Sequence, residues 1–163
     1  MIYKKTWKYI LTRDDSYYCT QYGYYKLKAI KNFSNISKGD IGGFVQHCHN
    51  LSHKGNCWVY HNAWVYNDAT VSKNAVVSKD ACVYGDAQVT GNAIVTGHAR
   101  IYGNARVSGN AKVRENVQVT GDAQISGNAK IQGNASVFGN AKVLGNANIE
   151  GAEVICGNSI VDK

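Results

Sequence analysis

The sequence predicts an all-β protein: a parallel β-helix shaped as a triangular prism, with a small N-terminal β-hairpin as its cap. One six-residue unit, Gly-Asn-Ala-x-Val-x, recurs eighteen times from Gly55 to Asp162 without an insertion. The third position of each unit is small in nearly every copy, and the fifth is always Val or Ile. Hexapeptide periodicity of this kind is typical of a parallel β-helix.

Each hexad is expected to form one short strand and one corner. Positions three and five alternate with positions four and six, so the small and aliphatic residues point inward. Gly-Asn at positions one and two tolerates the positive φ that a tight corner needs. Three hexads close one coil of eighteen residues, so residues 55–162 make six coils with a height of about 29 Å at the usual strand spacing. The inward third position includes Ala63, Ala69, Ala75, Ala81, Ala87, Ala93, Ala99, Ala105 and Ala111.

Residues 1–54 are expected to form the cap and residues 55–163 the β-helix. The cap reads as strands at 7–12 and 24–30, joined by a polar turn around Arg13, Asp14 and Asp15, and then a glycine-rich segment at 39–43. Such a lid would cover the unpaired backbone groups of the first coil. At the other end, Glu153 occupies an inward position, and an inward charge discourages edge-to-edge pairing.

Composition predicts one domain in a reducing compartment. The chain has 163 residues and five cysteines, an odd number for a disulfide framework. Its first residues lack the apolar run of a signal peptide, and no stretch approaches the length of a membrane span. We therefore expect a cytoplasmic protein with no membrane partner.

Most of the net charge of +7 comes from the cap. Residues 1–54 hold nine Lys/Arg and three Asp, and seven of the eleven tyrosines lie between Tyr3 and Tyr25. Basic and aromatic residues together can bind nucleic acid. No recognised nucleic-acid motif is present. We favour a tyrosine-rich hairpin packed on the prism with its lysines in solvent.

The outward residues sort into three faces, because the same face returns every eighteen residues. Face one carries Trp58, Val76, Ile94, Lys112, Lys130 and Asn148, with Tyr60, Ser78, Thr96, Arg114, Gln132 and Glu150. Face two carries Trp64, Cys82, Arg100, Gln118, Ser136 and Val154, with Tyr66, Tyr84, Tyr102, Thr120, Phe138 and Cys156. Face three carries Thr70, Gln88, Arg106, Gln124, Lys142 and Ile160, with Ser72, Thr90, Ser108, Ser126, Leu144 and Asp162.

Faces one and two predict self-association. Their large apolar residues would form a patch that a monomer seldom exposes, and two unlike faces that meet head to tail give a closed ring. We expect a homotrimer with these residues at its interfaces: Trp58, Trp64, Tyr66, Val76, Ile94 and Phe138.

The clefts between subunits are the predicted ligand sites. Tyr84, Arg100 and Tyr102 lie within two adjacent coils of face two, and Lys112 and Arg114 of a neighbour could reach the same depth. Flat rings beside cationic groups suit a planar, phosphate-bearing molecule such as a nucleotide. The alternative is interface packing with incidental surface charge.

The aliphatic-plus-small hexad resembles the left-handed hexapeptide-repeat β-helix family, and the left hand is implied by that resemblance alone. The family includes many acyl-CoA-dependent acyltransferases, which use a catalytic histidine with loops between coils and an added C-terminal helix. This chain has no inserted loop between 55 and 162. Its candidate general base is His98, at a corner, where a histidine is more often a tolerated polar residue. We assign no catalytic residue.

A metal site near the cap is a further hypothesis, because zinc-type ligands cluster there. Cys57 falls at an inward position that suits a packed thiol, and no standard finger spacing is present. We expect neither a metal nor a cofactor. The clustered residues are His47, Cys48, His49, His53 and Cys57.

A closer resemblance covers residues 24–66. The runs 24–30, 39–45, 50–52 and 55–60 are similar to the opening of a group of uncharacterised bacterial and prophage hexapeptide-repeat proteins, some labelled acetyltransferase or polymer-forming. The leading hypothesis is a non-catalytic trimer that binds an anionic, nucleotide-type molecule. The resemblance implies the cytoplasm of a bacterium or of a phage-infected bacterial cell, and in the second case the protein would be a phage sponge that sequesters an immune signalling nucleotide. The alternatives are an acyl-CoA-dependent acyltransferase and a structural module that stacks end to end.

Overall fold

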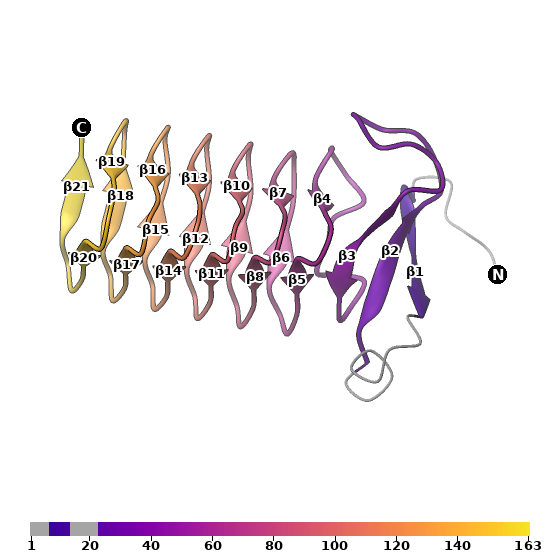
Figure 1. The fold of residues 1–163 in the computed structure, drawn as a ribbon, viewed down its shortest axis with the longest axis horizontal. Coiled ribbons are helices and arrows are strands. Elements are labelled where there is room, and N and C mark those ends of the chain that lie inside the picture. The colour runs from indigo at the N-terminus through magenta and orange to yellow at the C-terminus, as the bar shows by residue number, and fades with distance from the viewer. Residues whose placement is uncertain (1–6, 14–22) are drawn as a thin grey trace.

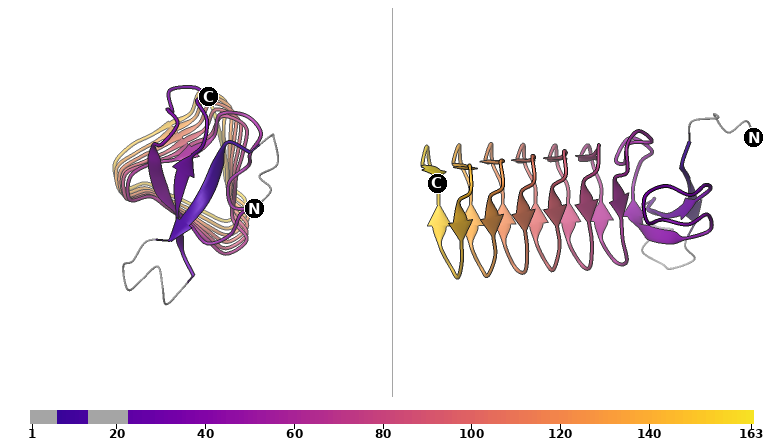
Figure 2. Two further views of the ribbon diagram at one scale, coloured as in Figure 1. Left: turned by 90° about the vertical axis from the view of Figure 1, so that its right-hand side faces the viewer. Right: turned by 90° about the horizontal axis from the view of Figure 1, so that it is seen from above.

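The computed structural model describes residues 7–13 and 23–163, and in these residues it contains strands and turns but no helix. Short strands follow one another as the coils of a parallel β-helix, and three longer strands lie at its N-terminal end (Figure 1). Viewed along its axis, the coils superpose into one triangular outline (Figure 2). The all-β β-helix with an N-terminal hairpin is confirmed.

Each face of the prism is one sheet, and from β4 onward the neighbouring strands of each sheet are three apart in sequence. The sheet of face one contains β4 (Trp58–Val59), β7 (Val76–Val77), β10 (Ile94–Val95), β13 (Lys112–Val113), β16 (Lys130–Ile131) and β19 (Asn148–Ile149). The sheet of face two contains β3 (Ile41–Val45), β5 (Trp64–Val65), β8 (Cys82–Val83), β11 (Arg100–Ile101), β14 (Gln118–Val119), β17 (Ser136–Val137) and β20 (Val154–Ile155). The sheet of face three contains β6 (Thr70–Val71), β9 (Gln88–Val89), β12 (Arg106–Val107), β15 (Gln124–Ile125), β18 (Lys142–Leu144) and β21 (Ile160–Asp162).

From β4 onward, the register of these sheets is eighteen residues at each step. Arg100 pairs with Cys82 on one side and with Gln118 on the other. The amide of Arg100 donates to the carbonyl of Val117 over 2.9 Å, and the same pattern repeats from turn to turn. The predicted sorting of outward residues into three faces is therefore confirmed.

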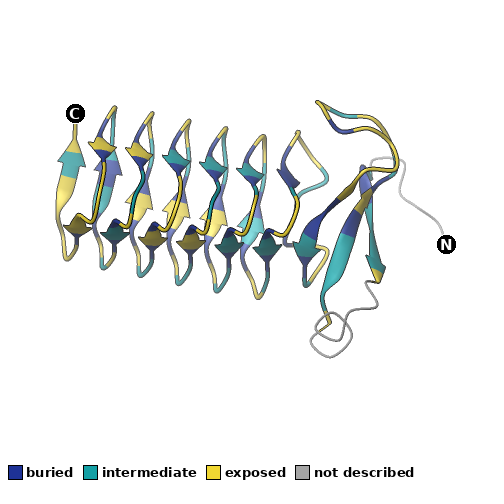
Figure 3. Cartoon of the chain, in the orientation of Figure 1, coloured by how far each residue is buried: buried dark blue, intermediate teal, exposed yellow. Residues whose placement is uncertain are grey.

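The core is a column of small and aliphatic side chains inside the prism. Residues such as Ala99, Ile101, Ala105 and Val107 are fully buried, while residues between them are exposed or half-buried (Figure 3). Small residues at position three leave room for the branched residue at position five, so the interior fills without long side chains. The hexad pattern predicted this core.

The corners combine positive φ with a feature that the sequence analysis missed. Gly91 has φ 75°, and a Cβ added there would lie 2.7 Å from the carbonyl oxygen of Gly109 in the next turn. Asn side chains along one corner also bond to each other, with amide-to-oxygen distances of 2.9 to 3.0 Å. This ladder ties successive turns together outside the core, and it runs through Asn74, Asn92, Asn110, Asn128 and Asn146.

The cap is an antiparallel hairpin that continues directly into the sheet of face two. β1 (Tyr9–Arg13) pairs with β2 (Tyr25–Ala29), and β2 pairs with β3. β3 then pairs in parallel with β5, with Phe44 beside Trp64. The parallel stack therefore begins before residue 55, and the described residues form about seven turns instead of six. The predicted turn at Asp14 and Asp15 lies outside the described residues.

Lys8 corrects the prediction that the cap lysines lie in solvent. Its side chain is buried at the N-terminal end of the prism, which we call the upper end. There Nζ donates to the carbonyl of Cys57 over 2.8 Å and to that of Gly55 over 3.1 Å. Burial lowers the pKa of the Lys8 ammonium, and the neighbouring Cys57 thiol opposes that shift. Lys8 thus satisfies the carbonyls of Gly55 and Cys57, just before β4, which is the end strand of the sheet of face one.

The last turn is more open. Val154 and Ile160 are 64% and 65% exposed. Glu153 holds the hexad position that is buried in the turns above, and it is exposed because nothing in the described residues packs beneath it.

Candidate binding site on face two

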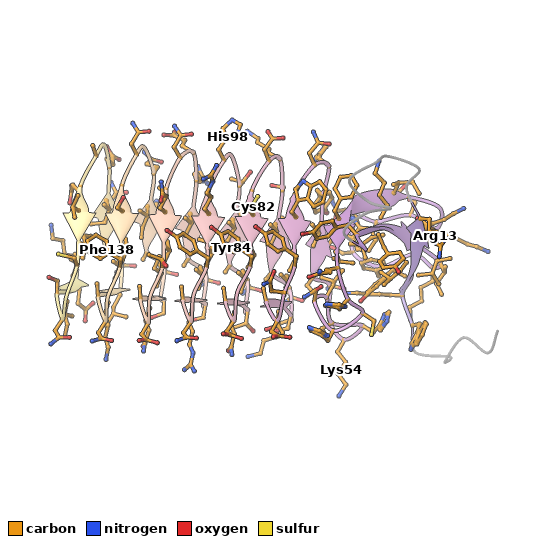
Figure 4. All side chains as sticks on the ribbon, turned by 90° about the horizontal axis from the view of Figure 1, so that it is seen from below. Arg13, Lys54, Cys82, Tyr84, His98 and Phe138 are labelled. Carbon is orange, nitrogen blue, oxygen red and sulfur yellow. The ribbon has the colours of Figure 1, made fainter. Side chains whose placement is uncertain are left out.

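A ladder of stacked tyrosine rings runs along face two. Tyr66, Tyr84 and Tyr102 occupy hexad position six of three consecutive turns, where the eighteen-residue register places them directly above one another. The ring centroids are 4.9 Å apart at both steps, and the ring planes differ by 1°. Figure 4 shows Tyr84 and Phe138 on the same side of the prism. All three tyrosines are half-buried, so part of each ring faces solvent.

The cap extends this ladder at its upper end. Tyr24 makes edge-to-face contacts with Trp64 and Tyr66, at centroid distances of 5.0 and 5.8 Å. Phe44 stacks on Trp64 at 4.1 Å. A shallow hollow in the surface is lined here by Tyr24, Trp64, Tyr66 and Cys82. The cap thus contributes aromatic surface to face two as well as covering the first coil.

The hydroxyls of Tyr66 and Tyr84 stay neutral at physiological pH. Burial raises the pKa of Tyr66 to about 12 and also raises that of Tyr84, while the Arg100 guanidinium opposes both shifts. Burial likewise raises the pKa of the Cys82 thiol. Tyr66 and Tyr84 therefore add no negative charge that would repel an anion.

Arg100 is an exposed cation beside this ladder. It lies between Cys82 above and Gln118 below in the sheet of face two. Within the described part of the chain, no carboxylate forms an ion pair with it. A second shallow hollow is lined by His98, Arg100, Asn116 and Gln118. This hollow offers a guanidinium, an imidazole and two amides in one place.

The structure gathers three of the five predicted ligand residues. Tyr84, Arg100 and Tyr102 share one face on adjacent turns, as predicted. Lys112 lies on β13 in the sheet of face one, and Arg114 follows that strand. Within one chain these two bases belong to another face, so they could join the site only from a neighbouring copy.

One predicted interface residue is in the wrong place. Trp58 is 1% exposed, because Tyr9 and Phe33 of the cap contact its ring at centroid distances of 6.2 and 5.5 Å. It is therefore core and cannot face a partner. The other residues keep outer surface: Phe138 is 39% exposed, and the half-buried set comprises Trp64, Tyr66, Val76 and Ile94. Their role at an interface stays a prediction.

His98 is exposed at its corner, with Nδ1 3.9 Å from a carboxylate oxygen of Asp80. That distance is too long to fix the tautomer of the imidazole, and the contact positions no nucleophile beside the ring. It therefore gives no specific sign of general-base chemistry. His98 instead contributes a polar edge to the hollow beside Arg100.

The residues considered for zinc make other contacts. His53 lies between the rings of Trp7 and Tyr9, at 5.0 and 4.1 Å, and burial lowers its pKa. His47 and His49 stack on each other at 5.1 Å, and Cys57 is buried as predicted. In residues 7–13 and 23–163, no three potential ligands come together to hold a metal ion.

Sequence reasoning missed Tyr24 and Phe44 as parts of face two. Both lie outside the hexad array, so the eighteen-residue period could not place them. The available signal was the local pattern around Phe44: a Gly-Gly-Phe-Val segment ends with an aromatic and an aliphatic residue, as the later Trp64-Val65 pair does.

Comparisons with known proteins support the repeat architecture. The model of the YdcK beta solenoid repeat family matches residues 99–115 and 123–139. A search of curated proteins finds no match. Among the described residues, no helix has the length and apolar character needed to cross a membrane. Together with the stacked parallel turns, the matched segments establish that this chain is a β-helix repeat protein.

Proposed function

We propose that this protein is a non-catalytic binding protein whose face two holds an anionic small molecule with a planar ring, of the nucleotide type. One observation carries the proposal: the exposed Arg100 lies beside a ladder of stacked tyrosine rings and has no carboxylate partner among residues 7–13 and 23–163. A guanidinium can bind a phosphate through two parallel hydrogen bonds, and partly exposed rings offer stacking and edge contacts.

The composition of face two favours an anion. Between residues 64 and 156, its outward positions include one cation, Arg100, and no Asp or Glu. An acidic ligand would therefore meet an attractive potential that the face itself does not cancel. Two carboxylates lie on the corner near this hollow: Asp80 contacts His98, and Glu115 directly precedes Asn116.

A homotrimer stays part of the proposal. In such a ring, face one of a neighbouring copy would bring Lys112 and Arg114 to face two and complete a cluster of three bases. Sequestration of an immune signalling nucleotide by a phage would be one use of this site. No contact described above favours the acyltransferase or the stacking module.

The test is a calorimetric titration of the purified full chain with the four ribonucleoside 5′-monophosphates, with native mass spectrometry for the subunit count. We expect at least one of them to bind, and Arg100→Gln to weaken that binding by about tenfold or more, as loss of a charge-assisted hydrogen bond predicts. The matched control is Arg106→Gln, which removes the same charge one strand later on face three. Absence of binding to all four compounds, or equal losses in both variants, would overturn the proposal.

A further inference from the structure

We infer that Thr120 marks a gap in the aromatic ladder and that this gap is the seat of the ligand's planar ring, which Tyr102 and Phe138 stack from above and below. The inference rests on the proposed function and specifies where on face two the ligand lies. It follows from the order of residues at hexad position six of that face: Tyr66, Tyr84, Tyr102, Thr120, Phe138 and Cys156.

The backbone register fixes the level of the gap. The amide of Tyr102 donates to the carbonyl of Val119, and the amide of Thr120 donates to that of Val137, both over 2.9 Å. Thr120 therefore lies one turn below Tyr102 and one turn above Phe138. Two turns at the usual strand spacing amount to about 10 Å. A ring at the middle level would lie at the same spacing as the Tyr84 and Tyr102 rings, whose centroids are 4.9 Å apart.

Phe138 is the unexplained member of this column. It is 39% exposed, and its neighbours in the column are two small residues, Thr120 above and Cys156 below. No ring contacts it within the described residues, whereas Tyr84 has a stacked ring on both sides. A planar ligand at the Thr120 level would cover Phe138 and continue the ladder, so the exposure of Phe138 has an explanation in binding.

Polar groups lie beside the gap on the same strand. Gln118 precedes Thr120 by two residues, which is about 6.6 Å along a strand, and it lines the hollow that contains Arg100. A ring in the gap would thus have an amide near its edge. A substituent leading away from the ring would cross Gln118 and bring its phosphate to Arg100 and His98.

The number of ring gaps and cations on face two favours one small molecule over a polymer. Face two has one gap between rings and one cation, Arg100, among its outward residues from 64 to 156. Binding sites for single-stranded nucleic acid instead follow the backbone with a row of positive charges and several stacking rings. One ring seat and one cation match the chemistry of a nucleoside monophosphate.

The test fills the gap with a side chain. Thr120→Tyr would continue the column from Tyr102 to Phe138 at no expected cost to the fold, because an aromatic residue suits a strand surface. With adenosine monophosphate as the first probe, or whichever of the four monophosphates binds the unmodified chain, we expect affinity to fall by about tenfold or more, as loss of base stacking predicts. Thr120→Ala keeps the gap open and should stay within about threefold of the unmodified chain.

Two further measurements make the outcome specific. Ser126→Tyr adds the same ring at hexad position six of the same turn, on face three, and should leave affinity unchanged. In the unmodified chain, the Thr120 methyl resonance should shift on binding, because the ring current of a ligand seated at its level changes the magnetic field at the methyl group.

The outcomes separate this inference from the proposed function. If a monophosphate binds the unmodified chain and binds Thr120→Tyr equally well, the ring seat is wrong and binding elsewhere on face two stands. If no monophosphate binds, both proposals fail. If an octanucleotide of single-stranded RNA binds far more tightly than the monophosphate and Thr120→Tyr does not weaken it, the face binds a polymer and the single seat is overturned.

Discussion

Faces two and three of the prism share one backbone but differ in their outward residues. At hexad position six, face two carries Tyr66, Tyr84 and Tyr102, whereas face three carries short hydroxyl side chains at the matching turns. The strands of both faces are two or three residues long through the middle of the prism and follow the same register. The difference shows that the inward residues determine the fold, while the outward residues determine what each face can bind.

The comparison also supplies matched controls within one chain. Arg100 and Arg106 occupy the same hexad position on the two faces, and Thr120 and Ser126 do so as well. A substitution on face three therefore reproduces the change in charge or volume of its counterpart without touching the ladder.

The largest effect on stability should come from a change in the interior, because all three faces depend on the same buried column. Ala105 is fully buried, and Ala105→Glu would place a carboxylate in the apolar column. We expect a loss of more than about 3 kcal/mol in the free energy of unfolding, because an unpaired buried charge is costly. The measurement is chemical denaturation. Arg106→Glu, one residue later and exposed, should change stability by no more than about 0.5 kcal/mol, and equal losses in both variants would contradict the assigned interior.

A smaller loss should follow from Lys8→Met at the cap. The change removes the ammonium that donates to the carbonyls of Gly55 and Cys57 and leaves those acceptors unsatisfied. We expect a loss of about 1–3 kcal/mol, measured by denaturation. Hydrogen exchange should show the first affected amides near β3 and β4, below the cap. The control is Lys28→Met, on the exposed side of β2. A stability equal to that of the control would mean that Lys8 does not close the upper end.

The asparagine ladder should contribute less to the free energy of unfolding than Lys8 does. Its contribution should be to stability and not to binding on face two. Asn110 accepts from Asn92 and donates to Asn128, each over 2.9 Å at an exposed corner. Asn110→Ala should lower the free energy of unfolding by about 1 kcal/mol, measured by denaturation. The change should leave ligand affinity on face two intact. A loss of affinity without a loss of stability would place the ladder in the binding site.

The smallest expected effect is a dependence of stability on pH that comes from Tyr66 on face two. The pKa of Tyr66 is raised from its usual value near 10 to about 12. The associated stability is present below pH 10 and is lost as the pH rises from 10 through 12, because the folded chain retains a proton that the unfolded chain releases. Tyr66→Phe should therefore flatten the fall of the melting temperature across this range.

The absorbance of tyrosinate provides an independent readout of that titration. The difference between the unmodified chain and Tyr66→Phe should show one group that titrates near pH 12. A group that titrates near pH 10 would contradict the burial assigned to Tyr66. Face three has no tyrosine at its outward hexad positions, so no substitution there should alter this difference.

Much of the fold could be predicted because each hexad repeats the same physical pattern. The period of eighteen correctly placed Tyr84, Arg100 and Tyr102 on one face, since their positions depend only on register. Trp58 could not be placed in this way. Its cover comes from Tyr9 and Phe33, which precede it by 49 and 25 residues and lie outside the repeat.

The start of the stack was missed for a related reason. Val45 and Leu51 keep the six-residue spacing and pair with Val65 and Val71, but two extra residues separate Leu51 from Val59, which pairs with Val77. Asn50 fixes the chain just before Leu51: its side chain accepts from the amides of Gln46 and His47 and donates to carbonyls of the next turn. A pattern search that requires unbroken hexads stops between Leu51 and Val59, because the two extra residues shift the period there.

The most direct test of the central claim is to map ligand contacts onto the three faces by NMR. Adenosine monophosphate, or whichever of the four monophosphates binds, would be titrated into isotopically labelled full-length protein. The account predicts that the largest shifts fall on Arg100, Tyr102, Gln118 and Thr120, with face three unchanged. Shifts concentrated on face three or spread evenly over the prism would contradict it.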